Sequence, residues 1–163
     1  MKKYAKQDQR ALASWAIACA ERVLPLFEAA YPDDRRPREA LDAGRTWLRT
    51  GIFKLAEIRG ASLGAHAAAR AAKEQLAACF AARAAGQAVA TAHVPQHAFG
   101  AAYYALKALA AVAPAQAAAR VAAELQWQVA QTPDDLRDEV ATRVVVQQHA
   151  RGLHITIHKD EDF

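Results

Sequence analysis

The chain has 163 residues, a length that predicts one domain, residues 1–163, around a single hydrophobic core. It contains 44 Ala but only 7 Gly and 6 Pro, so its composition favours helices and excludes collagen-like, disulfide-scaffold and disordered classes. The formal net charge of +4 describes a mildly basic surface, which permits a nucleic-acid partner without implying one.

The first part of the chain has the spacing of helices. Large apolar residues recur every three or four positions from Asp8 to Tyr31, which predicts a first helix. Pro32 follows it, and Asp34 is placed to cap a second helix that continues to Gly51. The first helix also argues against a secretion signal, because its apolar stripe continues unbroken past the region where a signal would be cleaved.

A third helix is expected at about Phe53 to Ala72. Small residues recur along it at a spacing near four, at Ala56, Gly60, Gly64 and Ala67. This spacing predicts a smooth groove in which another backbone can approach closely. Charged residues in the same segment exclude a membrane helix.

Residues 84–106 contain no Asp, Glu, Lys or Arg, a run of 23 residues that is long enough to cross a bilayer. Its middle is polar, however, and most of the rest is Ala and Gly. A pair of buried central helices, at about Gln75 to Ala92 and Pro95 to Val112, is therefore favoured over a membrane span. A single helix kinked near His93 is the alternative.

Two more helices are expected, at about Pro114 to Ala130 and Pro133 to Gln148, the second with Thr132 as its hydroxyl cap. The predicted fold is therefore all-α, with six to seven antiparallel helices in a bundle or a short solenoid-like array. The helical core is expected to span residues 8–151.

The C-terminal tail, residues 152–163, changes its period, because Leu153, Ile155 and Ile157 alternate with polar residues. This alternation predicts a short β-strand. Such a strand either pairs with residues 143–148 through a turn at Gly152, or adds to a second copy of the chain and forms a homodimer.

Catalytic motifs are absent from the sequence. His93 and His97 lie four positions apart, but the His-Glu-x-x-His pattern of zinc proteases is missing, so a hydrogen-bonded packing role is favoured over metal binding. His149, His154 and His158 are a weaker metal-ligand set. Phosphate loops, dinucleotide fingerprints and nucleophile elbows are also missing. We predict no catalytic residues, no bound metal and no cofactor; an enzyme built around the first two histidines is a minor alternative.

The two cysteines, Cys19 and Cys79, lie sixty residues apart without a zinc-ligand pattern. Reduced, buried thiols in a cytoplasmic protein are the expected state.

Four strings of residues resemble a known family: ERVLPLFE at 21–28, RPREA at 36–40, AVATAHV at 88–94 and HAFGAAY at 97–103. They are similar to the Imm-5-like family of immunity proteins from bacterial polymorphic toxin systems, which are small and all-α. The resemblance runs from about Asp8 to Leu136 and leaves out the strand-like tail. Relatives of this kind are sometimes labelled as exonucleases, but the chain lacks the phosphate loop and coiled-coil arms that such an ATPase needs.

The resemblance implies stoichiometric binding to a cognate toxin through a protein–protein interface. Side chains with the chemistry of interface anchors are the candidate binding residues: Arg35, Arg36, Arg45, His93, His97 and Tyr103. The basic charge does not favour a nuclease as the toxin. The alternative function is a nucleic-acid-associated or regulatory helical binding module.

Overall fold

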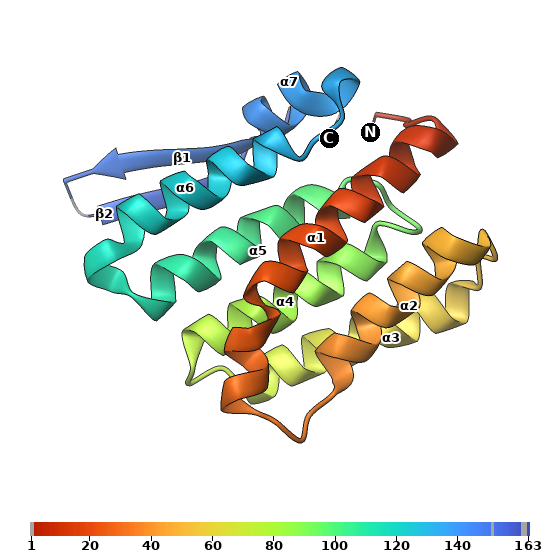
Figure 1. Cartoon of the computed structure of the whole chain (residues 1–163), viewed down its shortest axis with the longest axis horizontal. Coiled ribbons are helices and arrows are strands. Elements are labelled where there is room, and N and C mark those ends of the chain that lie inside the picture. The colour runs from red at the N-terminus through yellow and green to blue at the C-terminus, as the bar shows by residue number, and fades with distance from the viewer. Residues whose placement is uncertain (1, 151, 161–162) are drawn as a thin grey trace.

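The computed structural model describes residues 2–150, 152–160 and 163, and these residues form seven α-helices followed by a β-hairpin (Figure 1). The predicted all-α class with a C-terminal β segment is confirmed. The elements are α1 (Lys6–Ala30), α2 (Arg36–Thr50), α3 (Leu55–Ala71), α4 (Leu76–Ala90), α5 (His97–Val112), the 3-10 turn η1 (Pro114–Gln116), α6 (Ala117–Ala130), α7 (Asp134–Arg143), β1 (Val144–His149) and β2 (Gly152–Ile157).

The uncharged run of the sequence forms the centre of the molecule, as predicted. Helices α4 and α5 pack against each other, and α1 contacts α2, α4 and α5. In a solenoid each unit would contact only its neighbours, so these contacts define a bundle. Among the described residues, no single helix is long and apolar enough to span a membrane. Helix α5 and the segment Pro114–Ala130 together have the length and composition of a span, but the two are bent by 116° relative to each other.

The core combines many alanines with a few large anchors. Phe27 and Phe99 are fully buried, and Trp15 lies edge-on to Phe99 with ring centroids 6.4 Å apart. Because Ala presents only a methyl group, the helices approach closely between these anchors. Cys19 and Cys79 are both buried and free, as expected.

Several helix ends differ from the sequence prediction, and two of the differences affect the cleft region and the tail. Helix α5 begins at His97 rather than Pro95, because residues 91–96 form turns. Helix α7 ends at Arg143 rather than Gln148, so the helical core stops well before residue 151. Three consecutive β-branched residues, Val144 to Val146, favour the extended backbone that follows. The predicted Thr132 cap is also wrong, since the hydroxyl of that residue donates back to the Gln128 carbonyl at 3.0 Å.

The prediction of a close-packing groove along α3 is wrong. A Cβ added at Gly60 would have no atom within 4 Å and Ala56 is exposed, whereas α3 buries the opposite face with Ile58 and Ala65. Small residues occur on both sides of this alanine-rich helix, and Ile58 determines which side is buried because it is the larger apolar residue.

The tail pairs within the chain, which was the first of its two predicted arrangements. Strands β1 and β2 are antiparallel, with Val144 opposite Ile157 and His149 opposite Gly152. Gly152 has a φ of 120°, a conformation that L side chains rarely adopt. The predicted homodimer is not tested by this pairing and stays a prediction.

Candidate functional site

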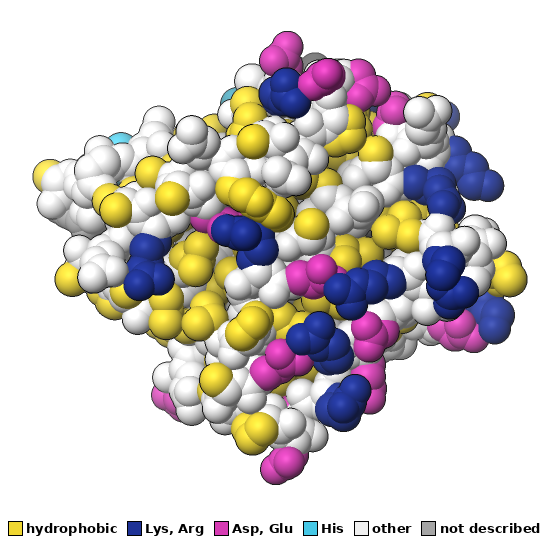
Figure 2. Space-filling view, viewed as in Figure 1, with side chains coloured by type: hydrophobic (Ala, Val, Ile, Leu, Met, Phe, Trp, Pro, Cys, Tyr) yellow, Lys and Arg dark blue, Asp and Glu magenta, His cyan; other side chains and the backbone are white. Residues whose placement is uncertain are grey.

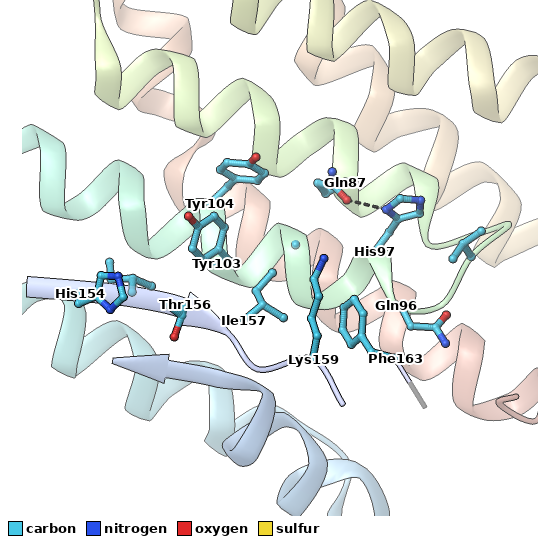
Figure 3. A pocket seen from close by; sticks show the side chains of 13 residues that line it. Gln87, Gln96, His97, Tyr103, Tyr104, His154, Thr156, Ile157, Lys159 and Phe163 are labelled. Carbon is cyan, nitrogen blue, oxygen red and sulfur yellow. Dashed lines mark hydrogen bonds between the residues drawn. The ribbon is translucent and has the colours of Figure 1, made fainter. Parts of the chain in front are cut away.

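A cleft of about 720 Å³ lies where β2 passes α5, and α4 contributes to its floor (Figure 3). We call it the α5–β2 cleft. Its lining comes from three parts of the chain: Gln87, Val94, Gln96, His97, Gly100, Tyr103, Tyr104, His154, Ile155, Thr156, Ile157, Lys159 and Phe163. A second hollow of about 380 Å³ shares Tyr103, His154 and Ile155 with it and extends the cleft toward Phe80 and Lys107.

A partly buried polar contact fixes one wall of the cleft. Gln87 on α4 accepts a hydrogen bond at its Oε1 from Nδ1 of His97, at 2.7 Å. This contact places the proton on Nδ1 and leaves Nε2 as an acceptor. Gly100 leaves the space for this amide, because a Cβ there would lie 2.8 Å from Gln87 Oε1. Burial, and then the nearby His93 and His66, lower the pKa of His97.

His66 on α3 adds a third imidazole beside this contact. Its ring lies against Gly86, where a Cβ would be 2.9 Å from Nε2. Burial and the positive charge of Arg83 lower the pKa of His66, and burial and Arg59 lower the pKa of His93. Within the part of the chain that the structure describes, no group of three His, Cys, Asp or Glu side chains could hold a metal ion.

Aromatic rings and cations alternate along α4 and α5. The rings of Tyr103 and Tyr104 are 5.0 Å apart, and Tyr104 stacks on Phe80 at 6.1 Å. Lys107 Nζ lies 4.6 Å from the Phe80 centroid, and Arg83 Nη1 donates to the Tyr104 hydroxyl at 3.3 Å. Such ring and cation pairs are typical of surfaces that bind a partner.

The far end of the cleft holds an unpaired acceptor. Gln96 is 7% exposed and donates from Nε2 to the Lys2 carbonyl at 2.9 Å. Its Oε1 is buried and accepts no hydrogen bond from any described residue. Phe163 closes this end, with Lys159 Nζ 5.0 Å from its ring centroid.

The structure brings together three of the six predicted binding residues. The rings of His93 and His97 are 5.5 Å apart, and His97 and Tyr103 both line the α5–β2 cleft. His93 itself is exposed beside it.

The three predicted arginines lie elsewhere, at the start of α2 and along it. Arg36 pairs with Asp34 at 2.5 Å, Arg45 pairs with Glu21, and Arg35 is exposed. Figure 2 shows Lys and Arg side chains interspersed with Asp and Glu over α1 and α2. The six residues therefore do not form one site.

Sequence reasoning missed Gln96, Lys159 and the contribution of β2. The alternating tail indicated the strand, but no local pattern indicated that it would lie beside α5. Tyr103 and Tyr104 were a partial signal, because adjacent helical residues point about 100° apart and cannot both be central in a core.

A comparison with protein families gives one match: a family model described as Imm-5 like putative immunity protein matches residues 2–135. The match covers α1 to α6 and ends within α7, so it leaves out the β-hairpin. Neither the curated proteins nor the solved structures include a match to this chain.

Proposed function

The chain belongs to the Imm-5-like family of immunity proteins, and from this membership we propose that it neutralises a cognate bacterial toxin in the cytoplasm by stoichiometric binding. The family match over residues 2–135 is the observation that carries the proposal. An immunity protein of this kind acts by occupying its target, so it needs an interface and no turnover site.

The size of the molecule is compatible with this role. A stable interface covers about 800 Å² on each partner, and the accessible surface of the chain is 8541 Å². Tight binding also needs a few aromatic or cationic anchors on a rigid support. Tyr103, Tyr104 and Lys107 supply such anchors on α5, which is packed on one side against α4.

The chemistry of the cleft favours binding over catalysis. His97 is hydrogen-bonded to an amide, and no described residue that lines the cleft is Asp or Glu. A general base of the usual kind is oriented by a carboxylate and contacts a nucleophile. The described lining residues include no carboxylate that could orient His97.

The nucleic-acid alternative has less support. The arginines at three positions of α2 all form ion pairs with carboxylates: Arg36, Arg38 and Arg45. Ion pairs of this kind reduce the positive field that would attract phosphates. The alternative stays a prediction, and the absence of any salt-sensitive binding to DNA or RNA at about 50 mM salt would exclude it.

The proposal is tested by co-expression with the toxin domain encoded beside this gene. We expect the chain to restore growth of cells that express the toxin and to co-purify with the toxin. Growth arrest that persists with every neighbouring toxin, at confirmed expression of both proteins, would contradict the proposal.

A further inference from the structure

We propose that the α5–β2 cleft binds an extended, acidic segment of the toxin, which lies along β2 as an additional strand. The identity of the partner rests on the proposed function. The location and the chemistry of the segment rest on three observations: the free edge of β2, the charge of the cleft lining, and the unpaired acceptors at one end of the cleft.

Strand β2 has one unpaired edge. The His158 amide donates to the Arg143 carbonyl at 2.7 Å, and hydrogen-bonding residues alternate along an antiparallel pair. The even-numbered residues of β2 therefore face β1, and Leu153, Ile155 and Ile157 direct their backbone groups to the other edge. Within residues 2–150, 152–160 and 163, these backbone groups have no hydrogen-bond partner outside the hairpin. Such an edge can accept a strand from another chain.

The unpaired edge borders the cleft. Strand β2 lies between β1 and α5, and α5 packs more closely against β2 than against β1 (Figure 3). The two connected hollows follow β2 from Leu153 to Ile157 above the side chains of Phe80, Tyr103 and Tyr104. An added strand would therefore lie on these aromatic rings, and the rings would bury the apolar side chains of the strand.

The lining of the cleft is cationic. Lys107 lies near Leu153, at one end of the cleft. Lys159, which follows Leu153 by six residues in the chain, lies at the other end. The structure describes no carboxylate partner for either lysine. By contrast, three arginines of α2 form ion pairs with carboxylates: Arg36, Arg38 and Arg45. In an extended strand, six residues span about 20 Å. A segment with acidic residues about six positions apart and apolar residues between them would match this lining.

Two acceptors at the far end, Gln96 Oε1 and His97 Nε2, receive no hydrogen bond from the described residues. Oε1 of Gln96 is buried without a hydrogen bond, and Nε2 of His97 is left free when Nδ1 donates to Gln87. A buried acceptor without a partner is costly. Because the His97 ring is only partly buried, its Nε2 can accept a hydrogen bond from a backbone amide of a bound segment, which favours a peptide over an inorganic anion as the ligand.

The test uses a synthetic probe rather than the toxin. The probe is the blocked peptide Glu-Val-Thr-Val-Thr-Val-Glu, and the control peptide has Lys in place of both Glu residues. Each is titrated into the ¹⁵N-labelled full-length chain and followed by NMR. We expect saturable shifts for the acidic peptide, centred on β2 and α5, and slower exchange of the Ile155 and Ile157 amides with solvent.

Two charge-matched double variants locate the site. K107E/K159E reverses the cleft lysines, and R49E/K54E reverses two exposed cations, one at the end of α2 and one just before α3, so both variants lower the net charge equally. Circular dichroism checks that each variant is folded. We expect K107E/K159E to weaken peptide binding at least tenfold and R49E/K54E to leave it within twofold.

Several results would overturn the inference. One is the absence of saturable shifts up to about 1 mM peptide, a concentration at which a complex with a millimolar Kd is half formed. The others are equal binding of the Lys-containing peptide and chemical shift changes centred on α2. A stable homodimer in which the β2 amides are already protected would also overturn it, because a second copy would then occupy the edge.

The same variants separate this inference from the proposed function. If the wild-type chain neutralises a toxin and K107E/K159E neutralises it equally well, the cleft is not the binding site, but the function stands. If the wild-type chain neutralises no neighbouring toxin, the function fails whatever the peptide shows. We expect K107E/K159E to lose neutralisation and R49E/K54E to retain it.

Discussion

Replacing Gly100 by Ala tests whether the hydrogen bond between Gln87 and His97 depends on the space that this glycine leaves. A Cβ at this position would lie 2.8, 3.0 and 3.1 Å from Oε1, Cδ and Cγ of Gln87. The 2.8 Å distance is shorter than real Cβ contacts and the other two are tight, so the flexible Gln87 side chain must shift. The hydrogen bond from His97, now 2.7 Å, would then be lost or lengthened.

Three contributions set the size of the effect. Overpacking a well-packed interior costs about 1–3 kcal/mol, and the lost hydrogen bond costs about 1 kcal/mol. Replacing Gly by Ala within a helix returns about 1 kcal/mol. We therefore expect Gly100→Ala to lower the free energy of unfolding by about 1–3 kcal/mol.

Gly60→Ala is the matched control, because Gly60 also lies inside a helix but has no atom within 4 Å of the place that a Cβ would take. It should raise the free energy of unfolding by about 1 kcal/mol through helix propensity alone. Urea denaturation followed by circular dichroism measures both variants. A Gly100→Ala protein as stable as the wild type, or an equal loss in both variants, would refute the reasoning.

Three further predictions concern stability. Trp15→Phe removes the 2.8 Å hydrogen bond from Nε1 to the Gln128 carbonyl and should lower the free energy of unfolding by about 1–3 kcal/mol in urea denaturation; an unchanged midpoint would contradict this. Arg22→Met removes the guanidinium that contacts Glu124 at 2.8 Å and leaves this carboxylate, which is 4% exposed, without its partner. Because Arg22 is itself partly exposed, the free energy of unfolding should fall by only about 1–3 kcal/mol. The double variant R22M/E124Q should recover part of this loss. Burial lowers the pKa of His66 and His97, so the unfolded chain binds more protons than the folded chain as the pH falls, and the free energy of unfolding should decrease between about pH 7.5 and about pH 5.5. The variant H66Q/H97Q should show a smaller decrease over that interval, and an equal slope would show that other groups are responsible.

The sequence predicted the helices well because their signals are local. Large apolar residues repeat at helical spacing through α1, and the uncharged run 84–106 was correctly assigned to two buried helices. The hairpin was one of two arrangements predicted for the tail, since three valines and an alternating tail both favour extended backbone, although the predicted last helix ran over the same valines. The family resemblance proved correct, and it depended on strings that lie in α1, in α2, in α5 and across the end of α4.

The sequence could not predict features that depend on distant contacts. The stripe of small residues on α3 was assigned to the wrong face, because alanines line both sides of that helix. Arg36 and Arg45 were selected as anchors, but the fold pairs them with Asp34 and Glu21. The α5–β2 cleft joins residues as far apart in the chain as Gln87 and Phe163, and only the packing of the tail against α5 creates it.

The central claim is that the chain inhibits a toxin by occupying it one to one. The most direct measurement titrates the purified chain into a fixed amount of the neighbouring toxin domain and follows the toxin's activity. We predict that activity falls in proportion to the added chain and reaches zero at equal molar amounts. Loss of activity at a small fraction of that amount would indicate turnover, and activity that persists in excess chain would contradict the claim.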